Sequence, residues 1–258
     1  MKNSLTIAGK ELAGYFLQPV AYVVMTVFLL LGGFFFFALL RYFEMTLAYS
    51  AAMQQNPEVL NQINLNQRVI EPMLHNLAIV LVILVPAITM RTFAEEKRTG
   101  TYELLLTAPI RTGEIVAGKF IAAASFMLIM IGLAGIFPLI LVAFGNPEVG
   151  VMFAGYLGLA FLAISFVSIG LFTSSLTENQ IIAAISCFGL LLLLFVISWP
   201  AQAGGSAYAD LLRYLSLPDH FAQMVTGIID TRDVVYFLSV IFVALFLTQR
   251  SVESARWR

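Results

Sequence analysis

Long apolar runs recur along this chain, and they constrain its fold more than any motif does. Six of them, each about 20 residues long, have no Asp, Glu, Lys or Arg in their interiors. A helix of about 20 apolar residues crosses a hydrocarbon core about 30 Å thick. Because lipid offers the backbone no hydrogen-bond partner, such a segment must bond within itself, as an α-helix does. The chain therefore predicts an all-α membrane protein with six transmembrane helices, at 20–40, 73–90, 120–144, 151–172, 180–199 and 233–248.

Composition agrees with a membrane protein and excludes several other classes. Hydrophobic residues make up 60% of the 258 residues and charged residues 11%, against roughly 25% charged in soluble domains. The net charge of −1 does not suit nucleic-acid binding, which needs a basic surface. Cys187 is the one cysteine, so an intramolecular disulfide and a cysteine metal cluster are excluded. The first apolar run exceeds the roughly 7–15 residues of a signal-peptide core and is expected to remain as an anchor.

The N-terminal segment, residues 1–19, predicts an interfacial helix. Apolar residues recur at helical spacing, whereas Lys10 and Glu11 lie elsewhere on the helical wheel. Pro19 is expected to end the helix where the chain turns into the bilayer. The alternative is a merely solvated leader. The apolar stripe consists of Leu5, Ala8, Leu12 and Phe16.

The remaining polar segments lie between the spans of a single transmembrane domain that covers residues 1–258. Residues 41–72 are too polar for lipid and predict short surface helices. The segments 145–150 and 173–179 predict short turns. Residues 200–232 predict two short helices that lie on, or dip into, the extracytoplasmic face.

The distribution of Lys and Arg predicts the orientation of these spans. With both termini on one side of the membrane, ten of the 14 Lys and Arg residues fall on that side and four on the other. Cytoplasmic segments carry the excess of positive charge in membrane proteins. Both termini and the segment 91–119 are therefore expected in the cytoplasm.

Charge collects in that segment, 91–119, between the second and third spans. It holds five of the 14 Lys and Arg residues, and the helix of the second span is expected to continue through F-A-E-E-K-R. Gly100 is expected to break this helix. Thr101 then caps a second helix whose first turn carries Glu103, with three leucines after it and Pro109 ending it. A short apolar helix outside the membrane needs a groove on a partner protein, although an ordinary solvated helix end is the alternative.

One near-match to a nucleotide-binding motif is rejected. Residues 113–119 have the G-x-x-x-x-G-K spacing of a phosphate-binding loop, but Phe120 stands where Ser or Thr must hold Mg²⁺. No buried strand precedes the motif, and a membrane span follows it. We expect Gly118 to serve packing or a tight turn, and Lys119 to extend toward the lipid headgroups.

The chain shows no constellation of catalytic or metal-binding residues. His75 and His220 lack a spaced third ligand for a metal. Asp219 and His220 follow Pro218 and read as the start of a helix, with the acid near its positive end. No nucleophile–base pair is evident, so the chain is not expected to be an enzyme.

The uncharged spans also limit the mechanism. Ion-coupled carriers place ionisable groups within the bilayer as relays or ligands, so a stand-alone secondary transporter or channel is disfavoured. A membrane anchor without transport is a second alternative. If the helices line a path, it is mostly apolar, and its cargo is expected to be apolar or amphipathic.

Several stretches together carry a family resemblance. They are P-A-I-T-M-R-T-F-A-E-E-K-R-T-G-T-Y-E-L-L-L-T-A-P-I at 86–110, G-K-F at 118–120, S-S-L-T-E-N-Q-I at 174–181, and residues 215–239. The chain resembles the type-2 ABC exporter permeases, most closely their gliding-motility (GldF-type) branch. K-E-L-A-G-Y-F-L-Q-P at 10–19 resembles the elbow helix of that branch. The resemblance covers nearly the whole chain.

The resemblance implies a non-catalytic subunit in the bacterial cytoplasmic membrane, paired with a separate ABC ATPase subunit. The ATPase would bind ATP and Mg²⁺, so no cofactor is expected in this chain. A second permease copy, or a related membrane subunit with an extracytoplasmic domain, would complete the complex. Closure of the ATPase would drive export, lipid movement or force transmission through the elbow helix, the extension of the second span and a coupling helix. The residues implied at the ATPase contact are Arg91, Glu95, Glu96, Arg98, Gly100, Thr101, Glu103, Leu104, Leu105 and Pro109, with Lys10 and Glu11 in the elbow helix.

Overall fold

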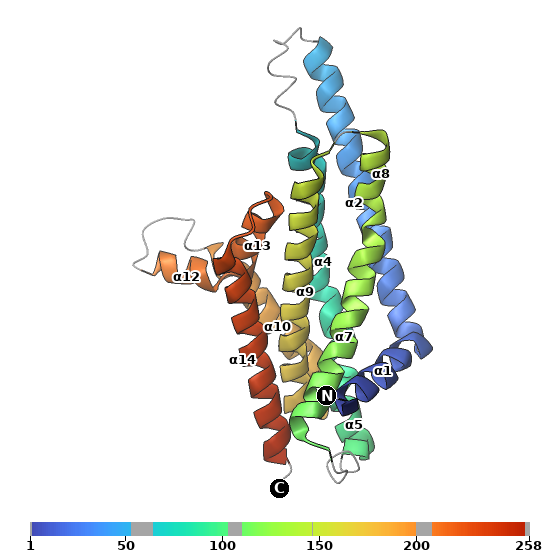
Figure 1. Cartoon of the computed structure of the whole chain (residues 1–258), viewed down its shortest axis with the longest axis vertical. Helices are drawn as coiled ribbons and strands as arrows, with labels where there is room; N and C mark the ends of the chain where they lie inside the picture. Colours follow the sequence, from blue (N-terminus) through green and yellow to red (C-terminus); the bar gives the residue numbers. More distant parts are fainter. Residues whose placement is uncertain (1, 53–63, 103–109, 146, 200–207, 256–258) are drawn as a thin grey trace.

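The computed structural model describes residues 2–52, 64–102, 110–145, 147–199 and 208–255, and helix is the regular secondary structure found within them. Upright helices form an elongated bundle, and α1 slants across its lower end (Figure 1). In chain order the elements are α1 (Lys2–Leu17), α2 (Pro19–Ala52), the π-helical turn η1 (Asn66–Ile70), α4 (Glu71–Thr89), α5 (Arg91–Thr99), α7 (Thr112–Ala134), α8 (Ile136–Phe144), α9 (Val149–Leu176), α10 (Gln180–Val196), α12 (Ala209–Leu215), α13 (Leu217–Val225) and α14 (Thr231–Ala255).

Within the described residues, five helical stretches are long and apolar enough to cross a membrane. The fifth predicted span corresponds to α10, which is apolar but only 17 residues long. At 1.5 Å per residue this is about 25 Å, somewhat less than the hydrocarbon core. The prediction of an all-helical membrane protein is confirmed, whereas the six-span arrangement stays a prediction. The five long stretches are Pro19–Ser50, Asn66–Thr99, Thr112–Phe144, Val149–Leu176 and Thr231–Ser254.

Several predicted boundaries are wrong because the helices run on beyond the apolar runs. α2 continues to Ala52, past residue 40. α7 begins at Thr112, so the end of the predicted loop is helical. α9 continues to Leu176, which shortens the next turn to residues 177–179. A helix keeps its backbone hydrogen bonds in lipid and in water alike. An apolar run therefore identifies the residues that lie in lipid, but not the residues at which the helix begins and ends.

Other local predictions are confirmed. α1 ends at Leu17, and Pro19 is the first residue of α2. Proline has no backbone N–H, and at the first position of a helix no hydrogen bond is lost because that N–H would have no acceptor within the helix. The second span does extend, as α5. Between the last two long helices, α12 and α13 are the two short helices expected there.

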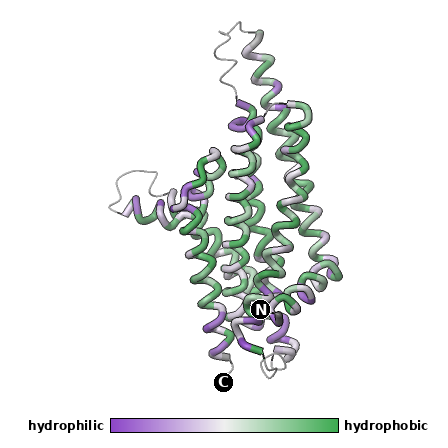
Figure 2. Tube along the Cα trace, viewed as in Figure 1, coloured by the Kyte–Doolittle hydropathy of each residue, from purple (hydrophilic) through white to green (hydrophobic). Residues whose placement is uncertain are grey.

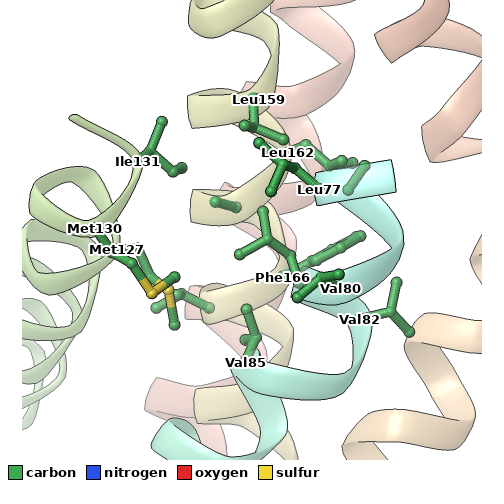
Figure 3. Close-up of a cluster of buried hydrophobic side chains, with 14 of the residues drawn as sticks. Leu77, Val80, Val82, Val85, Met127, Met130, Ile131, Leu159, Leu162 and Phe166 are labelled. Carbon is green, nitrogen blue, oxygen red and sulfur yellow. The ribbon is translucent and has the colours of Figure 1, made fainter. Parts of the chain in front are cut away.

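The core lies where α4, α7 and α9 meet (Figure 3). Leucines and valines of α4 face Leu162 and Phe166 of α9, and Met127 and Met130 of α7 fill the third side. These side chains are buried, and flexible methionines suit the irregular space between crossing helices. The long helices are hydrophobic along most of their length, while hydrophilic residues gather at the ends of the bundle (Figure 2).

Both marked termini lie at the lower end of the bundle, as does α5 (Figure 1). Away from that end, α13 packs against α9. Ser216 caps α13, its hydroxyl accepting from the Asp219 backbone N–H at 3.4 Å, so the predicted helix start is confirmed. His220 is buried, with Nδ1 2.7 Å from Oδ1 of Asp233 and Nε2 2.9 Å from the Tyr214 carbonyl oxygen. No group of three metal-ligating side chains occurs in the described parts of the chain.

Candidate functional site

α5 continues the line of α4 after a short break at Met90. Pro86 lies within α4 and has no N–H to donate to the preceding turn. The Met90 N–H still bonds to the Pro86 carbonyl at 3.0 Å, so the chain remains helical across the break. α5 ends at Gly100, which adopts φ 73°, a left-handed conformation that glycine takes without steric cost. The predicted helix break at Gly100 is confirmed.

A serine from α9 fills the break between α4 and α5. The Ser174 hydroxyl donates to the Met90 carbonyl at 3.0 Å and accepts from the backbone N–H groups of Phe93 and Ala94 at 3.1 and 3.2 Å. These are the backbone groups that a helix terminus leaves without partners. Ser174 is buried, so α5 is attached to α9 through its own backbone.

A second attachment lies one turn further along α5. The Lys97 ammonium donates to the Ser175 carbonyl at 2.6 Å, close to the end of α9. The C-terminal carbonyls of a helix carry partial negative charge, which favours a cation there. Ser251 of α14 donates to the same carbonyl at 3.0 Å. The Lys97 ammonium also lies 5.3 Å from the ring centroid of Tyr102, and burial together with the Glu96 charge raises the pKa of Tyr102 to about 12.

The centre of the site is Lys119, whose side chain is 1% exposed. Its ammonium lies 2.9 Å from Glu11 of α1 and 2.7 Å from Glu96 of α5. The expectation that Lys119 extends to the lipid headgroups is therefore wrong. A lysine is retained in such a position only where carboxylates replace its hydration, and here two of them do so.

Gly118 brings α1 close enough for this ion pair to form. A Cβ atom at Gly118 would lie 2.7 Å from Cγ2 of Ile7 and 2.9 Å from the Ser4 carbonyl oxygen. Any larger residue would push α1 away from α7. The predicted packing role of Gly118 is confirmed, and the rejected motif at 113–119 lies within the continuous helix α7.

A cavity of about 260 Å³ opens beside these residues, between α1, α2, α4 and α5. Arg91 lines it and donates to the Gln18 side chain at 3.4 Å. Among the described residues, Nε of Arg91 and Oε2 of Glu96 are buried without a hydrogen-bond partner. The cavity is thus lined by an arginine with an unused hydrogen-bond donor and a glutamate with an unused acceptor.

These helices form a mechanical junction. Lys119 joins α1, α5 and α7, and Ser174 and Lys97 join α5 to α9. A force applied to α5 would reach three other elements, α1, α7 and α9, through these buried polar contacts. Comparison with known protein families gives a match over most of the chain: the family described as "ABC-2 family transporter protein" matches residues 5–250.

The chain belongs to this family. It is the membrane subunit of an ABC transporter, a multi-pass protein that typically has no catalytic activity of its own, and the family implies a partner ATPase. No match is found among the curated proteins.

The structure divides the predicted contact residues of this ABC-2 permease into two sets. Glu11 and Glu96 face inward on Lys119, and Arg91 lines the cavity. The exposed set lies along α1 and at the end of α5. The remaining predicted residues, Glu103, Leu104, Leu105 and Pro109, lie outside the described residues. The exposed set comprises Lys10, Arg98, Gly100 and Thr101, while Glu95 is half-buried beside the cavity.

Sequence reasoning missed the residues that hold α5 in place. Lys97, Lys119, Ser174 and Ser175 were not among the predicted site residues. Thr173–Ser175 had been assigned to a hydrophilic turn, but they are buried in α9. The sequence carried part of the signal for Lys119. A lysine that follows a glycine at the edge of an apolar run can form a buried ion pair instead of facing water. Its two partners lie far away in the sequence, and only the fold shows them.

Proposed function

We propose that this ABC-2 permease receives movement from a separate ATPase subunit at the exposed end of α5 and at residues 103–109. The movement passes to the spans through the Lys119 junction. The supporting observation is that one buried ammonium bonds carboxylates from both α1 and α5. A solvated helix end would need no such attachment, so this geometry favours coupling over the alternative of an ordinary charged loop.

The proposed topology has six spans, with both termini and α5 in the cytoplasm. α10 is the shortest span, and α12 and α13 lie on the extracytoplasmic side. In this arrangement ATP and Mg²⁺ are bound by the ATPase subunit. The permease pairs with a second copy or with a related subunit that carries an extracytoplasmic domain, as in the gliding-motility branch that it resembles. The complex exports an apolar or amphipathic cargo or transmits force across the cytoplasmic membrane.

The test is ATP hydrolysis by the complex extracted in mild detergent from its native membrane. Arg98→Glu reverses an exposed charge at the end of α5 and should lower both the amount of bound ATPase and the hydrolysis rate. Glu103→Lys, in the adjoining segment 103–109, should do the same. Arg41→Glu is the matched control, because Arg41 is also exposed and lies on α2, beyond the first apolar run.

The control should leave ATPase binding and hydrolysis as in the unmodified complex. If Arg98→Glu and Glu103→Lys also leave both quantities unchanged, the coupling proposal is wrong and the membrane-anchor alternative gains support. Recovery of the permease without an ATPase, together with solute exchange in liposomes, would support the stand-alone transporter instead.

A further inference from the structure

The cavity beside Lys119 has the chemistry of a binding site for an amphiphile. One side of it is lined by charged and polar residues of α1 and α5, and the other by apolar residues of α2 and α4. At about 260 Å³ it is far larger than the roughly 30 Å³ that one water molecule occupies in the liquid. The apolar side is formed by Val20, Ala21, Ala87 and Ile88.

One polar atom of the cavity stands outside the contacts of Lys119. The Lys119 ammonium contacts Oε1 of Glu11 and Oε1 of Glu96, and Oε2 of Glu96 is left out of this pairing. Oε2 of Glu96 is buried and has no donor among the described residues. A buried acceptor without a donor is costly, so a cationic N–H donor is the group that this end of the cavity lacks.

The other end of the polar side lacks an anion. Arg91 forms no ion pair within the described residues, and its Nε is buried without an acceptor. A guanidinium in such a position is suited to a phosphate, because it presents several N–H donors in one plane. A ligand that carries both an ammonium and a phosphate would complement both ends.

The cavity also adjoins the apolar surface of the bundle. Leu17, Tyr22 and Val23, which are neighbours in sequence of the lining residues, are exposed by 84%, 53% and 60%. Exposed apolar side chains next to a membrane-spanning helix contact lipid chains. The headgroup and the acyl chains of one lipid would thus find adjacent partners.

We propose that this cavity binds a phospholipid whose headgroup carries a phosphate and a primary amine, that is, phosphatidylethanolamine. The amine donates to Oε2 of Glu96, the phosphate accepts from Arg91, and the acyl chains lie on α2 beside Tyr22 and Val23. The lipid fills the space between α1 and α5, the two elements that Lys119 joins. No ATPase is needed for this binding, so the proposal stands or falls separately from the coupling proposal.

The test is lipid retention by the full chain, purified in detergent, stripped of lipid and then incubated with one lipid at a time. Native mass spectrometry counts the lipids retained from phosphatidylethanolamine, phosphatidylcholine and phosphatidylglycerol with the same acyl chains. Phosphatidylethanolamine should be retained about tenfold better than phosphatidylcholine, whose quaternary amine has no N–H. That is the factor expected of one hydrogen bond to a charged group. Glu96→Gln should reduce the preference, and the exposed Glu178→Gln should not.

A pair of glycine substitutions keeps the test decisive if Glu96→Gln does not fold. Gly14 lines the cavity and has no atom within 4 Å of an added Cβ, and Gly9 on the same helix is equally open but lies outside the cavity. Gly14→Leu should abolish retention of phosphatidylethanolamine, whereas Gly9→Leu should preserve it. Equal retention of the three lipids, or unchanged retention in Gly14→Leu, would overturn the proposal.

Discussion

At the scale of single residues, Lys119 shows how burial changes the contribution of an ion pair to stability. The pair Arg250–Glu253 also lies at 3.0 Å, but its arginine is 64% exposed. Water screens such a pair, which contributes about 0–1 kcal/mol. Lys119 is 1% exposed, and its removal would leave two neighbouring carboxylates facing each other in a poorly hydrated site.

We therefore expect Lys119→Met to lower the free energy of unfolding by about 3 kcal/mol. The substitution keeps the volume and removes the charge. Thermal unfolding in detergent should show a clear fall in melting temperature, while the exposed Arg250→Met should change it little. Adding Glu11→Gln and Glu96→Gln to Lys119→Met should restore much of the loss, because the repulsion is then gone. A melting temperature for Lys119→Met equal to that of Arg250→Met would contradict the role assigned to the junction.

Gly118 gives a second prediction at this scale. Alanine favours helix over glycine by about 0.5–1 kcal/mol, so Gly→Ala in an open position of α7 should stabilise the protein. Gly132 is such a position, since no atom lies within 4 Å of an added Cβ. Gly118→Ala should instead destabilise, because its Cβ would meet Ile7 and the Ser4 carbonyl. The measurement is the melting temperature of both variants together with protease cleavage of α1, which should be faster only in Gly118→Ala.

At the scale of the element, α5 is positioned by contacts that its own sequence does not contain. The helix formers of F-A-E-E-K-R and the glycine after them predict a helix and its end. They do not predict which helix it packs against. Ser174 and Ser175 decide that, and in the sequence they read as part of a polar turn because three hydroxyl residues stand together.

Ser174→Ala tests this attachment. The change removes the hydroxyl that bonds two buried N–H groups and one carbonyl, and a net loss of about 1–3 kcal/mol is expected for buried polar groups that lose such a partner. Hydrogen exchange should show faster exchange at Phe93 and Ala94, and the hydrolysis rate of the ATPase complex should fall. Ser254→Ala is the control, since its hydroxyl bonds only within its own helix at 2.9 Å. Unchanged protection at both amides would show that α9 does not hold α5.

At the scale of the whole molecule, the arrangement of the ends leads to a prediction about orientation. The start of α1, the end of α14 and α5 lie at one end of the bundle (Figure 1), and the excess of Lys and Arg in these segments predicts that this end faces the cytoplasm. Replacing the buried Cys187 by alanine gives a background for single-cysteine variants. Arg98→Cys should react with a membrane-impermeant maleimide only in inside-out vesicles, and Asp210→Cys only in intact cells or right-side-out vesicles. Labelling of Arg98→Cys in intact cells would reverse the proposed orientation.

The sequence by itself determined the class of the fold, since long uncharged apolar runs can satisfy their backbones in lipid only by bonding within themselves. It also determined the break at Gly100, the start of a helix around Pro218 and the two short helices before α14, because these depend on neighbouring residues. Its family resemblance implied an ATPase contact at α5, and this contact stays a prediction.

Only the tertiary structure determined which partners the charged and polar side chains bond. The partners of Lys119 stand 108 and 23 residues away, and Ser174 lies 84 residues from the carbonyl it bonds. Local pattern carries no information over such separations, and a polar side chain has the same residue type whether it is solvated or buried. Whether Lys119 reaches Glu11 as well as Glu96 depends on how close α1 comes to α7, which is set by the absence of a side chain at Gly118.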